Sequence, residues 1–105
     1  MAYYALLYEA GEDFVERRTP FREEHLNMAK TAHQRGELML AGALGDPVNR
    51  ALLVFQGESQ DAARNFAQND PYVRNGLVKR WEVSPWNVVV GGDAEPVATA
   101  ARGDR

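Results

Sequence analysis

The sequence predicts an α+β fold in a single domain, and three observations lead to this prediction. The chain has 105 residues, which is enough for one domain of ordinary size and too few for two. Hydrophobic residues make up 45% and charged residues 26%, a composition typical of globular proteins and unlike that of disordered ones. Segments with the patterns of strands and helices follow one another in the order strand, helix, strand, strand, helix, strand.

A charged connection separates the first predicted strand from the first helix. Tyr3–Tyr8 is rich in aromatic and aliphatic residues and predicts a mostly buried strand. After the connection, Glu9–Arg18, Thr19 is expected to cap a helix. Proline is favoured at the first helical position, so the helix is expected over Pro20–Arg35. Gly36 then ends the helix, because glycine readily adopts the left-handed conformation found at helix C-termini.

Two strands and a second helix come next. Leu38–Leu44 and Ala51–Gln56 predict the second and third strands, which are joined by a turn. Ser59 is expected to open the second helix, with Asp61 in the first turn, where the helix dipole favours an anion. The pair Asp70-Pro71 must interrupt this helix, because the residue before a proline is pushed out of helical geometry.

The C-terminal part of the body predicts two further strands, Val78–Val83 and, after a proline, Trp86–Val90. The order predicts a ferredoxin-like βαββαβ plan with an extra C-terminal strand, in which two helices cover one face of an antiparallel sheet. The other face of the sheet is too apolar to meet water, so two copies are expected to pack sheet against sheet. Residues 1–90 form this domain, and residues 91–105 are predicted to be a flexible tail.

Charge and cysteine content exclude several functional classes. Twelve basic and fifteen acidic residues give a net charge of −3, so binding to nucleic acid through phosphate contacts is not expected. The absence of cysteine excludes disulfides, thiolate catalysis and cysteine-based metal sites. No stretch predicts a membrane span or a signal peptide, so the expected location is the cytoplasm. Glycine-rich nucleotide-binding motifs are also absent, and no cofactor is expected.

The chain has two histidines for acid–base chemistry near neutral pH. His25 lies at helical spacing from Phe21, Met28 and Ala32, in the middle of the apolar stripe that must face the sheet, whereas His33 lies at its edge and is expected to be structural. A buried imidazole needs a hydrogen-bond partner, because leaving it unpaired costs about 1–3 kcal/mol. One interpretation of His25 is a core residue held by a backbone carbonyl. The other is a residue that lines a cavity and transfers protons.

Asp70 is the second candidate for chemistry. An aspartate before Pro71 is typical of a helix N-cap, and this is the simplest interpretation of Asp70. A capping bond occupies only part of a carboxylate, which offers about four acceptor sites. Asp70 is therefore also able to orient an imidazole such as that of His25, as an aspartate does for a general base.

A substrate-binding set is predicted around these two residues. Arg22, with Arg17 and Arg18, forms a basic cluster near the helix start that suits an acidic ligand, the alternative being plain surface. Gly42, in the middle of a strand, indicates either a bulge or the close approach of a ligand or backbone. Tyr72 completes the set, the alternative being a packing anchor in the core or an interface.

A series of short motifs follows one another along the chain. They are Tyr3-Tyr4-Ala5-Leu6-Leu7-Tyr8, Arg22-Glu23-Glu24-His25-Leu26, Gly36-Glu37-Leu38, Ala41-Gly42-Ala43-Leu44, Asp70-Pro71-Tyr72-Val73, Gly76-Leu77-Val78 and Trp81-Glu82-Val83-Ser84-Pro85-Trp86-Asn87. In this combination, over about residues 2 to 91, the chain resembles the YciI-like (YCII-related) proteins. The resemblance implies a ferredoxin-like fold assembled as a dimeric α+β barrel. It also implies an active site formed by a helix histidine and the aspartate of the Asp-Pro motif, here His25 and Asp70.

The resemblance implies a range of reactions rather than one. The chemistry is of the lyase, isomerase or dehydrohalogenase type on a small metabolite that is cyclic or acidic, with His25 as general acid or base and Asp70 as its partner. No cofactor is expected for such a reaction, and a metal site made of these two residues would have too few ligands. The alternative function is a non-catalytic, dimeric module that binds a small molecule or another partner.

Overall fold

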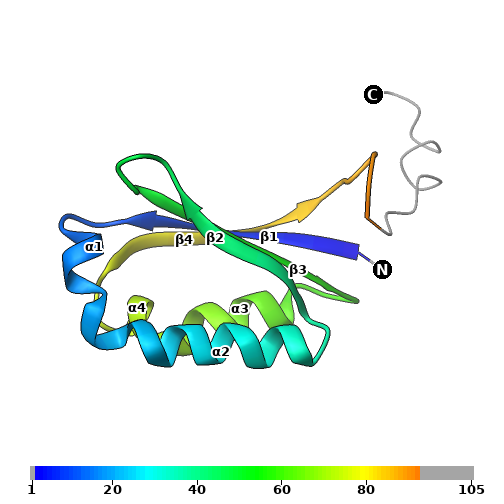
Figure 1. The fold of residues 1–105 in the computed structure, drawn as a ribbon. Helices are drawn as coiled ribbons and strands as arrows, with labels where there is room; N and C mark the ends of the chain where they lie inside the picture. The colour runs from blue at the N-terminus through cyan, green and yellow to red at the C-terminus, as the bar shows by residue number, and fades with distance from the viewer. Residues whose placement is uncertain (1, 93–105) are drawn as a thin grey trace.

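The chain folds into one sheet with its helices packed on a single face, and a computed structural model describes residues 2–92 (Figure 1). The elements are β1 (Ala2–Ala10), α1 (Phe14–Arg17), the 3₁₀ turn η1 (Thr19–Phe21), α2 (Arg22–Gln34), β2 (Leu38–Leu44), β3 (Arg50–Gly57), α3 (Asp61–Asn69), α4 (Pro71–Arg74) and β4 (Val78–Trp86). The strands lie in the order β2-β3-β1-β4, and every neighbouring pair is antiparallel. The predicted α+β, ferredoxin-like class is therefore confirmed.

The core lies between the sheet and the helices, and alternation along the strands decides which side chains enter it. Leu6 and Tyr8 of β1 face the helices and are almost completely buried, as are Leu53 and Phe55 of the neighbouring β3. The predicted apolar stripe of α2, including the buried Ala32, packs against the same cluster. This packing places His25, the polar residue of the stripe, between α2 and the sheet.

The two ends of α2 differ in how well the sequence predicts them. Thr19 does not cap the helix: it lies inside η1, and no side-chain hydrogen bond caps η1 or α2. The predicted cap is wrong because the chain enters the helix through a 3₁₀ turn held by its own backbone bonds. At the other end Gly36 has φ = +82°, its N–H donates to the carbonyl of His33, and the N–H of Glu37 donates to that of Ala32. This pair of bonds ends the helix as predicted.

A short helix interrupts the connection that was expected over Glu9–Arg18. This helix, α1, has four residues, which is too few to produce a helical hydrophobic period. Its Phe14 is buried and presents its ring to Tyr72, with centroids 5.4 Å apart and planes at 86°. Through Phe14, the connection therefore packs against Tyr72 of α4.

The predicted extra C-terminal strand over Trp86–Val90 is wrong. β4 runs without a break from Val78 to Trp86, and residues 87–92 contain no strand. β4 continues through Pro85 because β1 is long enough to pair with it there: Tyr3 pairs with Trp86, and Tyr4 pairs with Pro85. Proline is tolerated there because β4 is an edge strand of the sheet.

The second face of the sheet is uncovered within residues 2–92, where no helix lies on it (Figure 1). Leu40 and Trp86 are 67% and 45% exposed. Of the predicted flexible tail, residues 93–105 lie outside the described residues. No helix of the described part is long and apolar enough to cross a membrane.

Candidate active site

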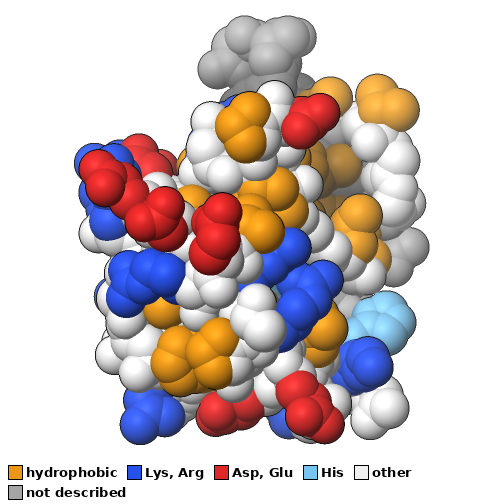
Figure 2. Space-filling model, turned by 60° about the vertical axis from the view of Figure 1, so that its left-hand side comes forward, with side chains coloured by type: hydrophobic (Ala, Val, Ile, Leu, Met, Phe, Trp, Pro, Cys, Tyr) orange, Lys and Arg blue, Asp and Glu red, His pale blue; other side chains and the backbone are white. Residues whose placement is uncertain are grey.

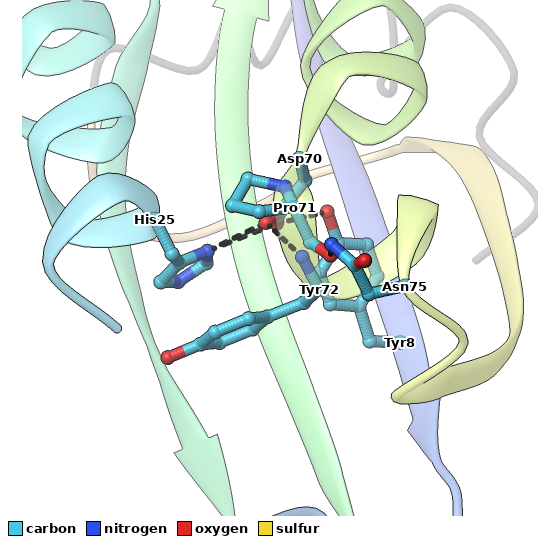
Figure 3. Close-up of polar contacts among 6 residues, drawn as sticks. All are labelled: Tyr8, His25, Asp70, Pro71, Tyr72 and Asn75. Atoms are coloured by element: carbon cyan, nitrogen blue, oxygen red, sulfur yellow. Dashed lines mark hydrogen bonds and ion pairs between the residues drawn. The ribbon is translucent and has the colours of Figure 1, made fainter. Parts of the chain in front are cut away.

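Asp70 lies at the centre of the candidate site and is fully buried, with 0% of its surface exposed. Its Oδ2 accepts a hydrogen bond from the Tyr8 hydroxyl at 2.7 Å, and its Oδ1 accepts one from the backbone N–H of Tyr72 at 2.9 Å. The Nδ1 atom of His25 lies 3.0 Å from Oδ1 and 2.9 Å from Oδ2 (Figure 3). A buried carboxylate is costly unless it is hydrogen-bonded, and these three donors meet that requirement.

The local sequence explains how Asp70 reaches this position. Pro71 forces the preceding residue out of helical geometry, and Asp70 accordingly adopts an extended backbone between α3 and α4. Its side chain then caps α4 by accepting from the Tyr72 N–H, so the capping interpretation is confirmed. The same carboxylate also faces His25 of α2, as the second interpretation required.

The hydrogen bonds decide which proton each group carries. Ionised Asp70 only accepts hydrogen bonds, so the Nδ1 of His25 carries a proton and donates it. The Nε2 of His25 then holds the free lone pair whenever the ring is neutral. Burial and, next, the negative charge of Asp70 raise the pKa of the Tyr8 hydroxyl above its ordinary value, so Tyr8 remains a donor.

Aromatic rings hold the imidazole of His25 in place. The Tyr72 ring stacks on it with centroids 4.0 Å apart and planes at 11°, and the Phe66 ring approaches it at 6.2 Å and 79°. The side chain of His25 is 15% exposed. The ring is therefore packed against two aromatic neighbours while part of it remains accessible.

A pocket of about 250 Å³ lies beside His25, between α2 and the strands β2 and β3. Its lining is mostly apolar with a few polar groups: Tyr8, Phe14, Arg18, Arg22, His25, Leu26, Ala29, Ala41, Gly42, Ala43, Ala51, Leu53 and Tyr72. Within residues 2–92 neither Arg18 nor Arg22 forms an ion pair. Figure 2, in which the left-hand side of Figure 1 is turned toward the viewer, shows Lys and Arg side chains near the middle of this face. These features suit a small ligand with an apolar ring and a negative charge.

A larger groove of about 630 Å³ lies between α2 and α3. Polar surface side chains such as Glu23, Asn27 and Asn65 form much of its wall, and neither His25 nor Asp70 lines it. His25 therefore lines the smaller pocket and not this groove.

The predicted site residues lie together. His25, Arg22, Gly42 and Tyr72 line the pocket, and Asp70 lies directly behind the imidazole. They come from α2, β2 and the α3–α4 junction, so the fold joins segments that are distant in the sequence.

Gly42 reaches the pocket through its backbone. It pairs with Leu52 in regular register, and the irregularity of β2 lies between Leu38 and Leu40 instead. The bulge interpretation of Gly42 is therefore wrong. Nothing lies within 4 Å of a Cβ built on Gly42, so the sequence position tolerates a side chain on that side of the strand.

The sequence does not single out Tyr8 as a member of this site. Its contact with Asp70 joins residues 62 positions apart, which no local pattern reveals. The available signal was the alternation of β1, which places Tyr8 on the same face as the buried Leu6. A tyrosine hydroxyl on a buried face needs a polar partner, and Asp70 is that partner.

Among residues 2–92, no three or more histidine, aspartate and glutamate side chains gather closely enough to hold a metal ion. His33 is exposed, and its Nδ1 lies 2.7 Å from the carbonyl oxygen of Leu38. This bond ties the end of α2 to β2 and agrees with the structural role predicted for His33.

Comparisons with known proteins agree with the fold. The profile of the YCII-related domain matches residues 1–87. Protein YciI of Escherichia coli is 28% identical over 95 residues, which cover 82% of this chain and 97% of that protein. An uncharacterized protein of Haemophilus influenzae is 28% identical over 96 residues, which cover 83% of this chain and 98% of that one.

Two solved structures have a similar fold. One is the 5-chloro-2-hydroxyhydroquinone dehydrochlorinase TftG of Burkholderia phenoliruptrix in complex with 2,5-dihydroxybenzoquinone. Its TM-score is 0.66 at 18% identity, covering 80% of this chain and 92% of that chain. The other is a protein of Agrobacterium tumefaciens, with a TM-score of 0.58 at 15% identity, covering 90% of this chain and 100% of that chain.

Proposed function

Because this chain belongs to the YCII-related domain family, we propose that it is a small enzyme in which His25 and Asp70 transfer protons on a small cyclic or acidic metabolite. The observation that carries the proposal is the carboxylate of Asp70 facing the Nδ1 of His25 at 2.9–3.0 Å, beside a pocket. Such a pair fixes the tautomer of the ring and leaves Nε2 to act as base or, once protonated, as acid. The proposed reaction needs neither a metal nor a nucleotide cofactor.

The reaction type that we propose is elimination or isomerisation. Nε2 of His25 removes a proton from an O–H or C–H group of the substrate, and the electron pair left behind forms a new double bond. In the dehydrochlorination of a chlorinated hydroxyhydroquinone, one hydroxyl proton first moves to the ring carbon that carries chlorine, which gives the keto form. Removal of a second hydroxyl proton by His25 then expels chloride with the electrons of the C–Cl bond, and the imidazolium releases its proton to water. The substrate loses HCl in total, so no oxidant or reductant takes part. The name of TftG, whose fold is similar, supports this type of reaction.

The experiment uses 5-chloro-2-hydroxyhydroquinone and measures chloride release by the wild-type protein and by His25→Gln and Asp70→Asn. Loss of a general acid–base group lowers the rate by about 10²- to 10⁴-fold, and we expect losses in that range for both variants. His33→Gln is the matched control, because His33 bonds to a backbone carbonyl outside the pocket. Circular dichroism checks that each variant is folded. A folded His25→Gln protein that releases chloride at the wild-type rate would refute the proposal.

The second candidate is a non-catalytic module that binds a small anion, and Arg18 and Arg22 beside the pocket favour it, because neither forms an ion pair within residues 2–92. Titration with 2,5-dihydroxybenzoquinone separates the two functions. Binding that is unaffected by His25→Gln, together with no chloride release by the wild-type protein, would support the module.

We further propose that the protein acts as a homodimer in the cytoplasm. The uncovered second face of the sheet supports the dimer, because it exposes apolar side chains such as Leu40 and Trp86. The location remains a prediction from the sequence alone.

A further inference from the structure

The Tyr72 hydroxyl is the feature of the pocket that the acid–base pair does not explain. Tyr72 is 3% exposed, and no group among residues 2–92 stands in regular hydrogen-bond geometry to its buried Oη, although the Arg22 guanidinium is close enough to lower its pKa. Leaving a buried hydroxyl unpaired costs about 1–3 kcal/mol, so such groups are rare and usually have a role. Because Tyr72 lines the pocket, a ligand oxygen is able to provide the missing partner.

The orientation of Tyr72 separates its hydroxyl from Asp70. Figure 3 shows the Tyr72 ring beneath the imidazole of His25, with the hydroxyl at the end of the ring away from Asp70. The two rings are nearly parallel, at 11°. One wall of the pocket therefore carries the imidazole and the tyrosine hydroxyl side by side, facing the same ligand.

Two positively charged side chains line the pocket together with the Tyr72 hydroxyl. Arg22 and Arg18 line the same pocket, and no carboxylate of the described chain neutralises either guanidinium. Burial raises the pKa of the Tyr72 hydroxyl, whereas these two positive charges oppose the rise. The hydroxyl therefore stays protonated near neutral pH and acts as a donor beside a cation.

We propose that the Tyr72 hydroxyl and the Arg22 guanidinium together bind an ionised oxygen on a planar ring, so that the pocket takes cyclic enolates or phenolates. The inference rests on the proposed function, because it concerns the same pocket. A volume of about 250 Å³ and the small side chains of Ala41, Ala43 and Ala51 suit a single ring. When His25 removes a proton from the substrate, negative charge develops on the conjugated oxygen, and the two donors stabilise it.

The test compares the affinities for two single-ring probes, 2,5-dihydroxybenzoquinone and hydroquinone. The hydroxyl groups of the first are vinylogous acids and are ionised at neutral pH, whereas hydroquinone is neutral. We expect the wild-type protein to bind the ionised probe at least about tenfold more tightly. Tyr72→Phe removes only the hydroxyl, and Arg22→Gln removes the charge. Each is expected to weaken binding of the ionised probe by about 10- to 100-fold and to leave hydroquinone binding nearly unchanged.

Two controls separate binding from folding. Tyr72→Phe keeps the ring that stacks on His25 and removes no hydrogen bond of regular geometry among residues 2–92, so its melting temperature should stay close to that of the wild type. Arg17→Gln removes a neighbouring charge that does not line the pocket and should leave both affinities unchanged.

Some outcomes would overturn the inference. They are equal wild-type affinity for the two probes, no binding of the ionised probe, or wild-type affinity in folded Tyr72→Phe and Arg22→Gln. Failure of the proposed function is distinguishable, because it appears as no chloride release by the wild-type protein or as chloride release that does not depend on His25.

Discussion

His25 and His33 lie on the same helix, and the partner of each ring determines what it is able to do. The Nδ1 of His33 lies 2.7 Å from the carbonyl oxygen of Leu38. This carbonyl group fixes the ring but carries no net charge. The Nδ1 of His25 faces the buried carboxylate of Asp70, which fixes the ring and carries a negative charge when ionised. Of the two, His25 therefore has both a fixed ring and a counter-ion for the charge that the proposed proton transfer would create.

Tyr8→Phe is predicted to change how stability depends on alkaline pH. Burial and the charge of Asp70 raise the pKa of Tyr8 above its ordinary value of 10.0, so the unfolded chain loses this proton first as the pH rises. The contribution of Tyr8 is thus complete below pH 10.0 and declines above it, by about 1.4 kcal/mol per pH unit for one proton. Urea unfolding from about pH 9 to 11 should show a shallower decline in Tyr8→Phe, whereas Tyr4→Phe should decline like the wild type. Equal slopes in Tyr8→Phe and the wild type would contradict this.

The sequence was sufficient to predict His25 and Asp70 and insufficient to predict Tyr8. Helical spacing places His25 on the buried face, and the Asp-Pro pair places Asp70 at a helix start, so both follow from neighbours in the chain. Tyr8 meets Asp70 because β1 lies in the middle of the sheet beneath the α3–α4 junction. Sheet order is a tertiary property, and the local pattern of β1 does not contain it.

Among the elements, strand boundaries depended on pairing more than on composition. β2 begins and ends where its sequence pattern predicts, at Leu38 and Leu44. β4 extends past its predicted end because β1 offers partners as far as Trp86. Its pairing with β1 also shifts between Glu9 and Ala10, which brings Val78 into the core together with Trp81. Strict alternation along a strand would place Val78 and Trp81 on opposite faces.

Gly36→Ala is predicted to destabilise the end of α2. Gly36 has φ = +82°, where an L residue with a Cβ costs about 1–2 kcal/mol, although nothing lies within 4 Å of the added atom. The expected loss in the free energy of unfolding is therefore of that size and purely conformational. Urea denaturation measures it.

Gly42→Ala is the matched control for this substitution. Gly42 does not have a positive φ, and its added Cβ also meets nothing within 4 Å. Its stability should be unchanged or slightly higher, because alanine lowers the entropy of the unfolded chain. Equal losses in the two variants would show that the left-handed backbone of Gly36 is not the cause.

For the molecule as a whole, the uneven covering of the sheet is the property that bears on assembly. The helices bury one face, while the apolar side chains of the other face have no helix over them within residues 2–92. A domain of this size buries a modest fraction of its surface, so the proposed second copy on that face would add stability that the single chain lacks. The pocket lies on the helical side, so its described lining comes from one chain.

Leu40→Glu is predicted to convert a dimer into a monomer. Leu40 is 67% exposed and pairs with Val54 on the uncovered face, so a carboxylate there would be buried against the second copy without a partner. Sedimentation velocity at micromolar concentration should give twice the 11.7 kDa chain mass for the wild type and the single mass for the variant. Val15→Glu, at an exposed position of α1, should remain dimeric. A monomeric wild type, or a Leu40→Glu protein that stays dimeric, would show that this face is not the interface.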